Sequence, residues 1–495
     1  MSSQQQINKL LNRYPFDEEE LELLFRCHEA LVDNENESSF LLKMAKDSPY
    51  SFFFLPGDEM KSRVEFMEKD ILPAEFGEKL EGSISSDSFV DYANEGEEKM
   101  LELFLEGVAK CCGRRGPNEA FRIIFDCCCD GDQKEASCKK LIDLCYRLSI
   151  CKDILSVPNI DKSAILSRLS KHDSPSPALG KSLCGASGAS QVTRDVFIQW
   201  ADINAPLFAS VLSSFMHTLL FHGKPFPKSR TPFLKPELYQ ASEIFESSDS
   251  PLLFSLASMS PSMGGKWHRL YSSEVDGRSF NRLEWSLLGY SGPTNLLIKT
   301  DKDISLGALV STTWKDSGGF YGDSNSFLFQ LEPTTKVFHP VGKDTNFIYC
   351  NAKKMSVAQD GLPKGLGFGG NTNKPRLFIP ESLELCTAGY LDTTYEQGDL
   401  LPKESLEKFN IKTIEVWGVG GDEAINEALR ARAEYREYTS STINKARVVA
   451  DKKQFVHDLA SGVVYNSLYE HREKTRGRAE FRVDDSHDGY VLDRE

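Results

Sequence analysis

The sequence lacks several features that mark common protein classes. Its twelve cysteines never occur with Cys-x-x-Cys spacing, so the usual zinc-binding and thioredoxin-type signatures are absent. No Gly-x-Ser-x-Gly nucleophile elbow occurs, which removes the usual signal of a serine hydrolase. The net charge of −15 is not accompanied by a basic stripe. Because phosphate contacts need clustered cations, we expect no nucleic-acid partner.

Long apolar segments are also missing. The best membrane candidate, residues 206–221, has sixteen residues, whereas a bilayer span needs about 20. Residues 1–6 are polar and show no leader pattern, and Ser2 stands where a myristoylated chain has Gly. We therefore expect no myristoylation site, a cytoplasmic location and at most peripheral membrane association, with the nucleus left open.

Acidic residues and cysteines are both concentrated early in the chain. Residues 1–106 hold 25 Asp and Glu against 10 Lys and Arg, and the remainder is balanced at 48 against 48. Eight cysteines lie between Cys111 and Cys151. Such thiols favour a reducing compartment. Small buried side chains on helices, a redox-sensing cluster or a metal site would each account for them.

Periodicity predicts a helical amino-terminal half. The acidic residues 18–20 open a helix at the end that favours negative charge, and apolar side chains then recur at helical spacing. Residues 100–109, 119–125 and 139–148 repeat this pattern. The last two of these segments are separated by a glycine-containing loop, which predicts a helix–loop–helix shape.

That loop, residues 126–137, has the outline of an EF-hand calcium site. Asp126 and Asp130 take the first and fifth positions, and glycine takes the sixth. Cys128 at the third position is a poor ligand for a hard cation, and Ser137 at the twelfth cannot supply the bidentate carboxylate. The residues favour an EF-hand-like scaffold without calcium, and weak or altered calcium binding is the alternative.

Composition changes again in the middle of the chain. Residues 167–190 are rich in Ser, Pro and Gly, which is typical of a mobile linker. From residue 237 onward, apolar residues alternate in short runs such as 306–310 and 327–331, and many short strands predict a β-sandwich. The sequence thus predicts an acidic EF-hand-like helical domain (1–165), a linker with connecting helices (166–236), a β-sandwich domain (237–421) and a helical carboxy-terminal extension (422–495).

Four motifs lie in order within the predicted sandwich. They are WHRLYSSEVDGRSF at 267–280, FYGDSNSFLF at 320–329, GLGFGG at 365–370 and EVWGVG at 415–420. Together they resemble the TLDc domain, the module shared by oxidation-resistance and nuclear-receptor-coactivator-type proteins. The resemblance implies a two-sheet sandwich with flanking helices, and the helical half resembles the TLDc subgroup with EF-hand-related regions. The expected fold class is therefore multidomain α+β.

The resemblance also implies a function. TLDc proteins are linked to oxidative-stress protection and to binding of the vacuolar proton-pumping ATPase at vacuolar or lysosomal membranes. We therefore expect a non-enzymatic regulatory or interaction protein with protein partners and no cofactor. A redox-active protective protein that uses its cysteines, or a calcium-dependent adaptor, is the alternative.

Candidate contact residues lie in the first motif. Glu274, Asp276 and Arg278 stand together in a predicted turn. Turn geometry and local ion pairing explain such charges, and an exposed charged loop is also a typical partner contact.

Two other features of the predicted sandwich do not indicate a reactive thiol or a nucleotide site. Cys350 and Cys386 have no adjacent cation in the sequence that would lower a thiol pKa. The motif at 365–370 matches Gly-x-Gly-x-x-Gly but lacks the strand-then-helix context of a dinucleotide site. We expect these glycines to form a loop with positive φ angles, and we identify no catalytic or cofactor-binding residues.

Overall fold

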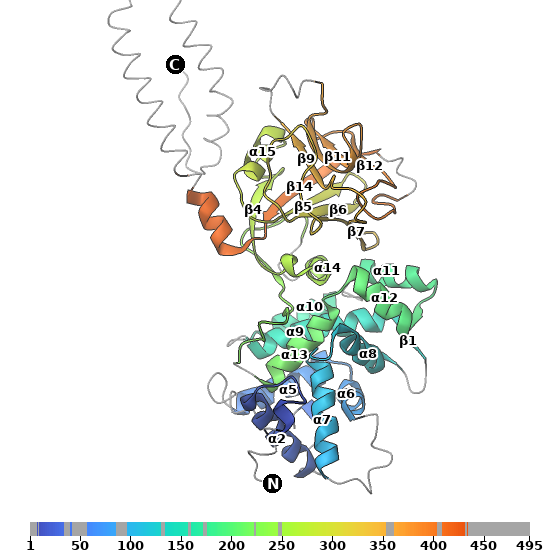
Figure 1. Ribbon diagram of the computed structural model, residues 1–495, viewed down its shortest axis with the longest axis vertical. Helices are drawn as coiled ribbons and strands as arrows, with labels where there is room; N and C mark the ends of the chain where they lie inside the picture. Colours follow the sequence, from blue (N-terminus) through green and yellow to red (C-terminus); the bar gives the residue numbers. More distant parts are fainter. Residues whose placement is uncertain are drawn as a thin grey trace, which may run out of the picture. The chain divides into compact units, whose positions relative to one another are not determined.

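The computed structural model divides the chain into two compact units (Figure 1). We call them the helical unit (residues 1–236, 248–264 and 333–337) and the sandwich unit (residues 237–247, 265–332 and 338–495). The structure describes residues 7, 9–33, 40–41, 57–85, 97–129, 134–156, 160–171, 176–221, 224–245, 250–352, 361–402, 408–430 and 433.

Helix α2 (Glu18–Asp33), which the acidic residues 18–20 predict, has a capped first turn. The backbone N–H of Asp17 donates to Glu20 Oε2 at 3.0 Å, and the N–H of Glu20 donates to Asp17 Oδ1 at 2.9 Å. This reciprocal pair satisfies two amides that a helix start otherwise leaves unbonded. The elements of the unit are α2 (Glu18–Asp33), α5 (Gly57–Phe66), the π-helical turn η1 (Met67–Ile71), α6 (Phe76–Ser85), α7 (Glu97–Cys111), α8 (Pro117–Cys128), β1 (Glu135–Ser137), α9 (Cys138–Ser156), α10 (Lys162–Lys171), α11 (Pro177–Ser187), β2 (Gln191–Thr193), α12 (Arg194–Asn204), α13 (Phe208–Leu220), α14 (Pro251–Met259) and the 3-10 turn η3 (Pro261–Met263).

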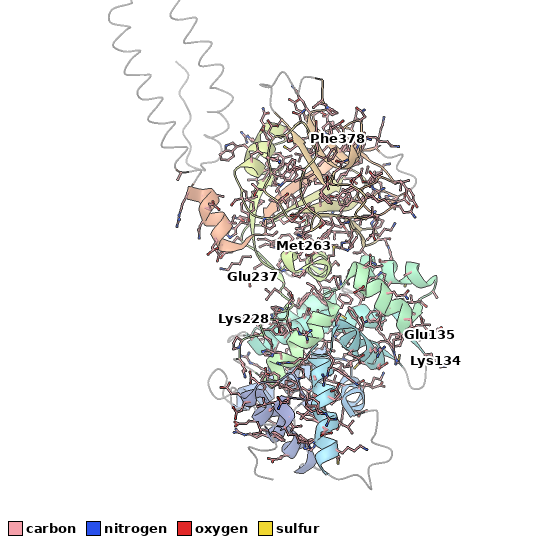
Figure 2. The ribbon with its side chains drawn as sticks, in the orientation of Figure 1. Lys134, Glu135, Lys228, Glu237, Met263 and Phe378 are labelled. Carbon is pink, nitrogen blue, oxygen red and sulfur yellow. The ribbon has the colours of Figure 1, made fainter. Side chains whose placement is uncertain are left out.

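Two helix–loop–helix pairs lie side by side in this unit. Helices α8 and α9 flank β1, and α11 and α12 flank β2. The two short strands pair antiparallel, with Glu135 (labelled in Figure 2) opposite Thr193 and Ala136 opposite Val192. The helix–loop–helix shape predicted around residues 126–137 is therefore present, and the structure adds a second one that the sequence did not predict.

The second pair replaces part of the predicted linker. The interpretation of residues 167–190 as a mobile linker is wrong over residues 167–171, which end α10, and over residues 177–187, which form α11. Ser176 caps this helix by accepting the N–H of Leu179 at 3.4 Å, proline fills its first position, and Gly188 ends it with φ of 72°. The Ser, Pro and Gly residues thus mark the two ends of a helix.

The apolar stretch at residues 206–221 contains α13, which is almost entirely buried. Among the described residues, no single helix has the length and composition of a membrane span. Helices α12 and α13 meet those criteria only as a pair, and the chain bends by 92° between them.

The sandwich unit has the two sheets that the alternation predicts. One sheet has seven strands in the order β3-β4-β14-β5-β6-β7-β8, and the other has five in the order β13-β12-β11-β10-β9. The elements are β3 (Pro236–Leu238), β4 (Gly265–Ser272), α15 (Phe280–Leu288), β5 (Thr294–Thr300), β6 (Ser305–Val310), β7 (Phe327–Glu332), β8 (Lys336–Phe338), β9 (Ile348–Asn351), β10 (Gly365–Asn371), β11 (Lys374–Pro380), β12 (Cys386–Ala388), β13 (Lys408–Phe409) and β14 (Ile411–Gly418). The predicted α+β class with a two-sheet sandwich is confirmed.

Both sheets contribute to one apolar core. Leu296 and Val416 come from the seven-stranded sheet, Leu366 and Phe368 come from the five-stranded sheet, and all four are fully buried. The ring of Trp314 meets that of Phe368 edge-on, with centroids 6.1 Å apart. Every residue of β6 is buried, so both faces of this strand are covered despite the alternation of residues 306–310.

The glycine motif at 365–370 is a strand and not the loop that we predicted. These residues form β10, which pairs with β9 on one side and β11 on the other. The expected positive φ angles are present within the strand, at 147° for Gly365, 64° for Gly369 and 69° for Gly370. Of the predicted extension at 422–495, residues 422–430 are helical, and nearly all of the rest lies outside the described residues.

Helix α14 belongs to the sandwich region by sequence but to the helical unit by its contacts. Phe254 packs against the rings of Tyr146, Phe208 and Phe233, with centroid distances of 5.3, 5.7 and 5.7 Å. Phe254 and Ala257 are part of the apolar core of the helical unit. A domain boundary drawn at residue 237 therefore cuts through a packed core.

We expect a fragment of residues 237–495 to self-associate, because it keeps α14 but lacks the helices that cover Phe254 and Ala257. Replacing residues 248–264 with a glycine–serine linker of equal length should restore a monomer. The sandwich should unfold in one cooperative transition in both fragments. Sedimentation velocity and thermal unfolding measure these properties, and two equally monomeric fragments would contradict the prediction.

Candidate functional site

The predicted charged turn is an exposed loop, residues 273–279, between β4 and α15. The side chains of Glu274 and Arg278 are exposed, whereas Asp276 is half-buried. Asp276 Oδ2 accepts the N–H of Ser272 at 2.8 Å, and its backbone carbonyl accepts the guanidinium of Arg282. Asp276 therefore maintains the shape of the loop, and Glu274 and Arg278 remain as the charges that a partner can reach.

Hydrogen bonds to neighbouring segments hold this loop in one conformation. The hydroxyl of Tyr271 donates to the carbonyl of Gly277 at 2.8 Å and accepts the N–H of Ser279 at 3.3 Å. Arg278 Nη2 donates to the carbonyl of Lys412 at 2.7 Å. Val275, at the tip of the loop, is 47% exposed. The loop thus presents two opposite charges and one apolar side chain on a fixed backbone.

The fourth motif supplies a buried carboxylate. Glu415 of β14 has no exposed surface. Its side chain accepts hydrogen bonds from Ser242 Oγ at 2.7 Å, from the N–H of Glu243 at 2.7 Å and from Trp417 Nε1 at 2.9 Å. A buried charge needs such donors, so Glu415 has a structural role in joining residues 242–243 to the sheet.

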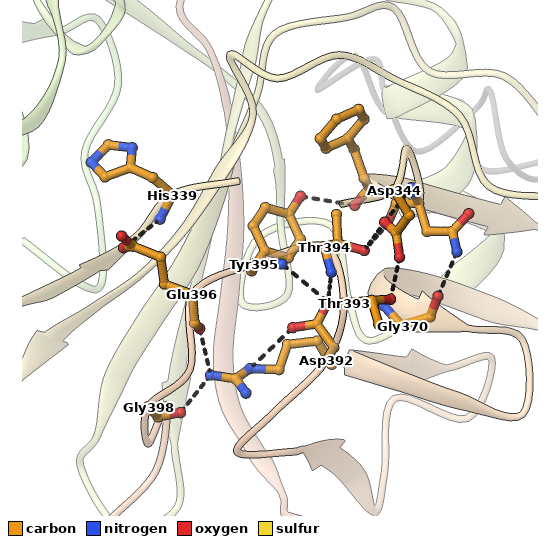
Figure 3. Close-up of polar contacts among 12 residues, drawn as sticks. His339, Asp344, Gly370, Asp392, Thr393, Thr394, Tyr395, Glu396 and Gly398 are labelled. Carbon is orange, nitrogen blue, oxygen red and sulfur yellow. Dashed lines mark hydrogen bonds and ion pairs between the residues drawn. The ribbon is translucent and has the colours of Figure 1, made fainter. Parts of the chain in front are cut away.

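A second polar cluster lies beside the five-stranded sheet (Figure 3). Arg376 of β11 is buried, and its Nη2 donates to the carbonyls of Glu396 at 3.3 Å and Gly398 at 2.5 Å. Its Nε lies 4.0 Å from Asp392 Oδ1, and both side chains are almost completely buried. Burial lowers the pKa of Arg376, and the charge of Asp392 opposes that shift.

Asp392 lies against the end of the glycine motif. Its Oδ2 accepts the backbone N–H groups of Gly370 at 3.0 Å, Thr394 at 2.9 Å and Tyr395 at 3.2 Å. A Cβ atom at Gly369 would lie 2.5 Å from the same oxygen. Gly369 therefore lets β10 approach a carboxylate of the protein, whereas a Cβ at Gly370 would lie 2.3 Å from the carbonyl oxygen of Lys374 on β11. The geometry does not require a phosphate ligand.

Asp344 fastens a neighbouring loop to the same cluster. It accepts the hydroxyls of Thr393 and Thr394, the latter at 2.6 Å (Figure 3). Burial acts to raise the pKa of Asp344, but these hydrogen bonds outweigh it and lower the pKa below its usual value. The carboxylate therefore stays ionised at neutral pH and holds loop 389–398 in place.

The buried thiols do not have the character of nucleophiles. Cys350 and Cys386 are both fully buried, and burial raises the pKa of Cys386 to about 12. Burial also raises the pKa values of Cys112 and Cys127 to about 12. The attacking species is the thiolate, which is scarce at neutral pH for such groups. All eight cysteines between Cys111 and Cys151 are buried.

The calcium candidates are not brought together among the described residues. Asp126 lies inside α8, and its Oδ1 accepts Arg194 Nη2 at 2.5 Å. Asp130 lies outside the described residues. The loop of the second pair, residues 188–193, contains no carboxylate. In the described part of the chain, no group of three or more His, Cys, Asp and Glu is placed to hold a metal ion.

We expect Asp392→Ala to lower the free energy of unfolding of the sandwich by about 3–5 kcal/mol, because it leaves the Arg376 cation buried without its counter-charge. Arg376→Met should cost less, since Asp392 keeps its three backbone donors. Hydrogen exchange of β10 and β11 in urea measures both losses. Lys374→Ala, exposed on the same strand, is the control and should stay within about 0.5 kcal/mol of wild type. A larger loss of unfolding free energy for Arg376→Met than for Asp392→Ala would contradict this account.

We expect no calcium binding in the range of about 10⁻⁷–10⁻⁵ M that sensor loops reach, since Asp126 is paired with Arg194 and Ser137 replaces the bidentate Glu. Calorimetric titration of the full chain tests this, with a matched titration of Asp126→Ala. Micromolar binding that disappears in the variant would show that the pair opens to admit the ion.

The comparisons with known proteins concern the region of the chain that contains the sandwich. A family model for the TLDc domain matches residues 238–420. The chain is 35% identical over 157 residues to the MTOR-associated protein MEAK7 of Xenopus laevis, a match that covers 31% of this chain and 32% of that protein. The chain is 34% identical over 173 residues to MEAK7 of Danio rerio, a match that covers 34% of this chain and 36% of that protein. It is 30% identical over 155 residues to Oxidation resistance protein 1 of Xenopus tropicalis, a match that covers 31% of this chain and 16% of that protein.

The matched part of the chain spans about a third of the length of the two MEAK7 relatives and less of the third protein. The match therefore covers the sandwich region and α14, and the function of residues 1–237 must be argued from those residues themselves. Its four motifs, its two sheets and the family match agree that residues 238–420 of this chain form a TLDc domain.

Proposed function

We propose that this chain is a non-enzymatic regulatory protein that acts by binding a protein partner through its TLDc domain. The observation that carries the proposal is the loop at 273–279, which exposes Glu274, Val275 and Arg278 on a backbone fixed by internal hydrogen bonds. A surface that is already ordered loses little conformational entropy on binding. Its opposite charges favour the orientation of one partner over others.

The vacuolar proton-pumping ATPase is the partner that we propose first, with protection from oxidative stress as the linked outcome. Support comes from the TLDc domain and from the similarity to Oxidation resistance protein 1. Peripheral association with vacuolar or lysosomal membranes would follow from such a partner. A second candidate is mTOR, because the relatives from Xenopus laevis and Danio rerio are named as MTOR-associated proteins.

The redox alternative has weaker support. It needs a thiolate that peroxide can reach, and the two thiols of the sandwich unit are fully buried. A calcium-dependent adaptor would need ligands that the pairing of Asp126 with Arg194 does not offer. Binding through a surface requires neither feature.

Reversing the loop charges with Glu274→Lys and Arg278→Glu should reduce partner capture by about tenfold, which corresponds to about 1.4 kcal/mol. Capture is measured by quantitative mass spectrometry of proteins retained by the tagged full chain from cell lysate. Recovery of proton-pump subunits supports the first partner, and recovery of mTOR supports the second.

Two further variants make this experiment specific. Lys374→Glu with Glu384→Lys is the matched control, because both residues are exposed and lie in or next to β11 of the five-stranded sheet. This double change, like the reversal of the loop charges, leaves the net charge unaltered. Cys350→Ala with Cys386→Ala should leave both capture and rescue of peroxide-sensitive cells intact. If a folded cysteine variant keeps its partner but loses rescue, the redox alternative replaces the binding proposal.

A further inference from the structure

We propose that α9, the start of α11, the start of α13 and the segment after α13 form a binding site for a short apolar helix, and that α14 occupies this site as a ligand from the chain's own TLDc domain. The proposal concerns the helical unit and does not depend on the loop at 273–279. Helix-in-groove recognition uses an apolar face with anchors at i and i+3 or i+4, and α14 meets this description.

Helix α14 has the character of a helical ligand. Seven consecutive residues, from Leu253 to Met259, are buried. Its start is defined locally, because Ser250 accepts the N–H of Leu252 at 3.4 Å and Pro251 fills the first position. A short helix with its own cap and no charged residue is suited to an apolar site.

The acceptor surface is aromatic. The ring of Phe254 contacts Tyr146 of α9, Phe208 at the start of α13 and Phe233 of the segment after α13. These three rings come from separate segments of the helical unit and surround one side chain. Ala257 lies three residues further along the same helix face and is fully buried. Phe254 is thus the anchor, and the small side chain at 257 allows close approach.

Two hydrogen bonds define the register of α14. Ser255 Oγ lies 2.8 Å from Ser176 Oγ, the atom that caps α11. The N–H of Leu207 donates to the carbonyl of Ser258 at 3.1 Å. The helix therefore bonds to the first turn of α11 and to the segment just before α13. These contacts distinguish α14 from an arbitrary apolar helix.

The source of this helix is the TLDc domain, since residues 251–259 lie within the matched range 238–420. A tethered ligand has an effective concentration in the range of about 1 mM. A free helix of the same sequence should therefore enter the site only in a chain whose own α14 binds weakly.

The test uses a fluorescein-labelled peptide of residues 248–264 and three full-length chains: wild type, Phe254→Ala and the exposed control Ser262→Ala. Fluorescence anisotropy should show binding to the Phe254→Ala chain at least about tenfold tighter than to the other two, since an alanine leaves the aromatic site vacant. A peptide that itself carries Phe254→Ala should not bind this chain.

Each outcome decides the proposal. A folded Phe254→Ala chain that does not bind the peptide, or equal binding to all three chains, overturns it. If circular dichroism shows that this chain does not fold, Phe254→Leu provides the milder weakening, and its binding is judged by the same criteria. Hydrogen exchange gives an independent readout: Tyr146→Leu in the acceptor should speed exchange of residues 251–259 while β5 and β6 are unchanged. Unchanged exchange in α14 would also overturn the proposal.

Discussion

The sandwich depends on strand β14, which enters the middle of the seven-stranded sheet between β4 and β5. Because this strand comes from the carboxyl end of the domain, the sheet is complete only when residues 411–418 are in place. Its buried Glu415 requires hydrogen-bond donors, and it finds them in Ser242, the backbone of Glu243 and Trp417. These bonds join the first segment of the domain to its last strand.

The same strand supports the loop on which the proposed function rests. The N–H of Ser273 donates to the carbonyl of Ile414 at 3.0 Å, and Arg278 bonds to the carbonyl of Lys412. Bonds to β14, between residues 134 and 141 positions apart, therefore add to the local hydrogen bonds that shape the loop. On the other sheet, two buried charges fasten loop 389–398: Asp392 of the loop accepts the N–H of Gly370 on β10, and Arg376 of β11 donates to the carbonyl of Gly398.

The structure also separates the limits of the TLDc match from the limits of a packed core. Residues 248–264 lie inside the matched range, yet Phe254 and Ala257 complete the apolar core of the helical unit. Folding of the helical unit and the position of this TLDc segment are therefore coupled.

The sequence by itself predicted the helix that opens at residues 18–20 and the helical segments 100–109, 119–125 and 139–148, because helical spacing is a local property. The structure places these segments inside the helices 18–33, 97–111, 117–128 and 138–156. Alternation and the four motifs likewise predicted the two-sheet sandwich and the charged loop. Only the tertiary structure decided that Asp126 pairs with Arg194, that Asp276 holds its own loop, that Gly369 makes room for Asp392, and that α14 packs in the helical core. Each of these depends on how a side chain's hydrogen bonds and burial are satisfied in the folded chain, mostly by residues far apart in sequence, and periodicity and composition carry no information about those partners.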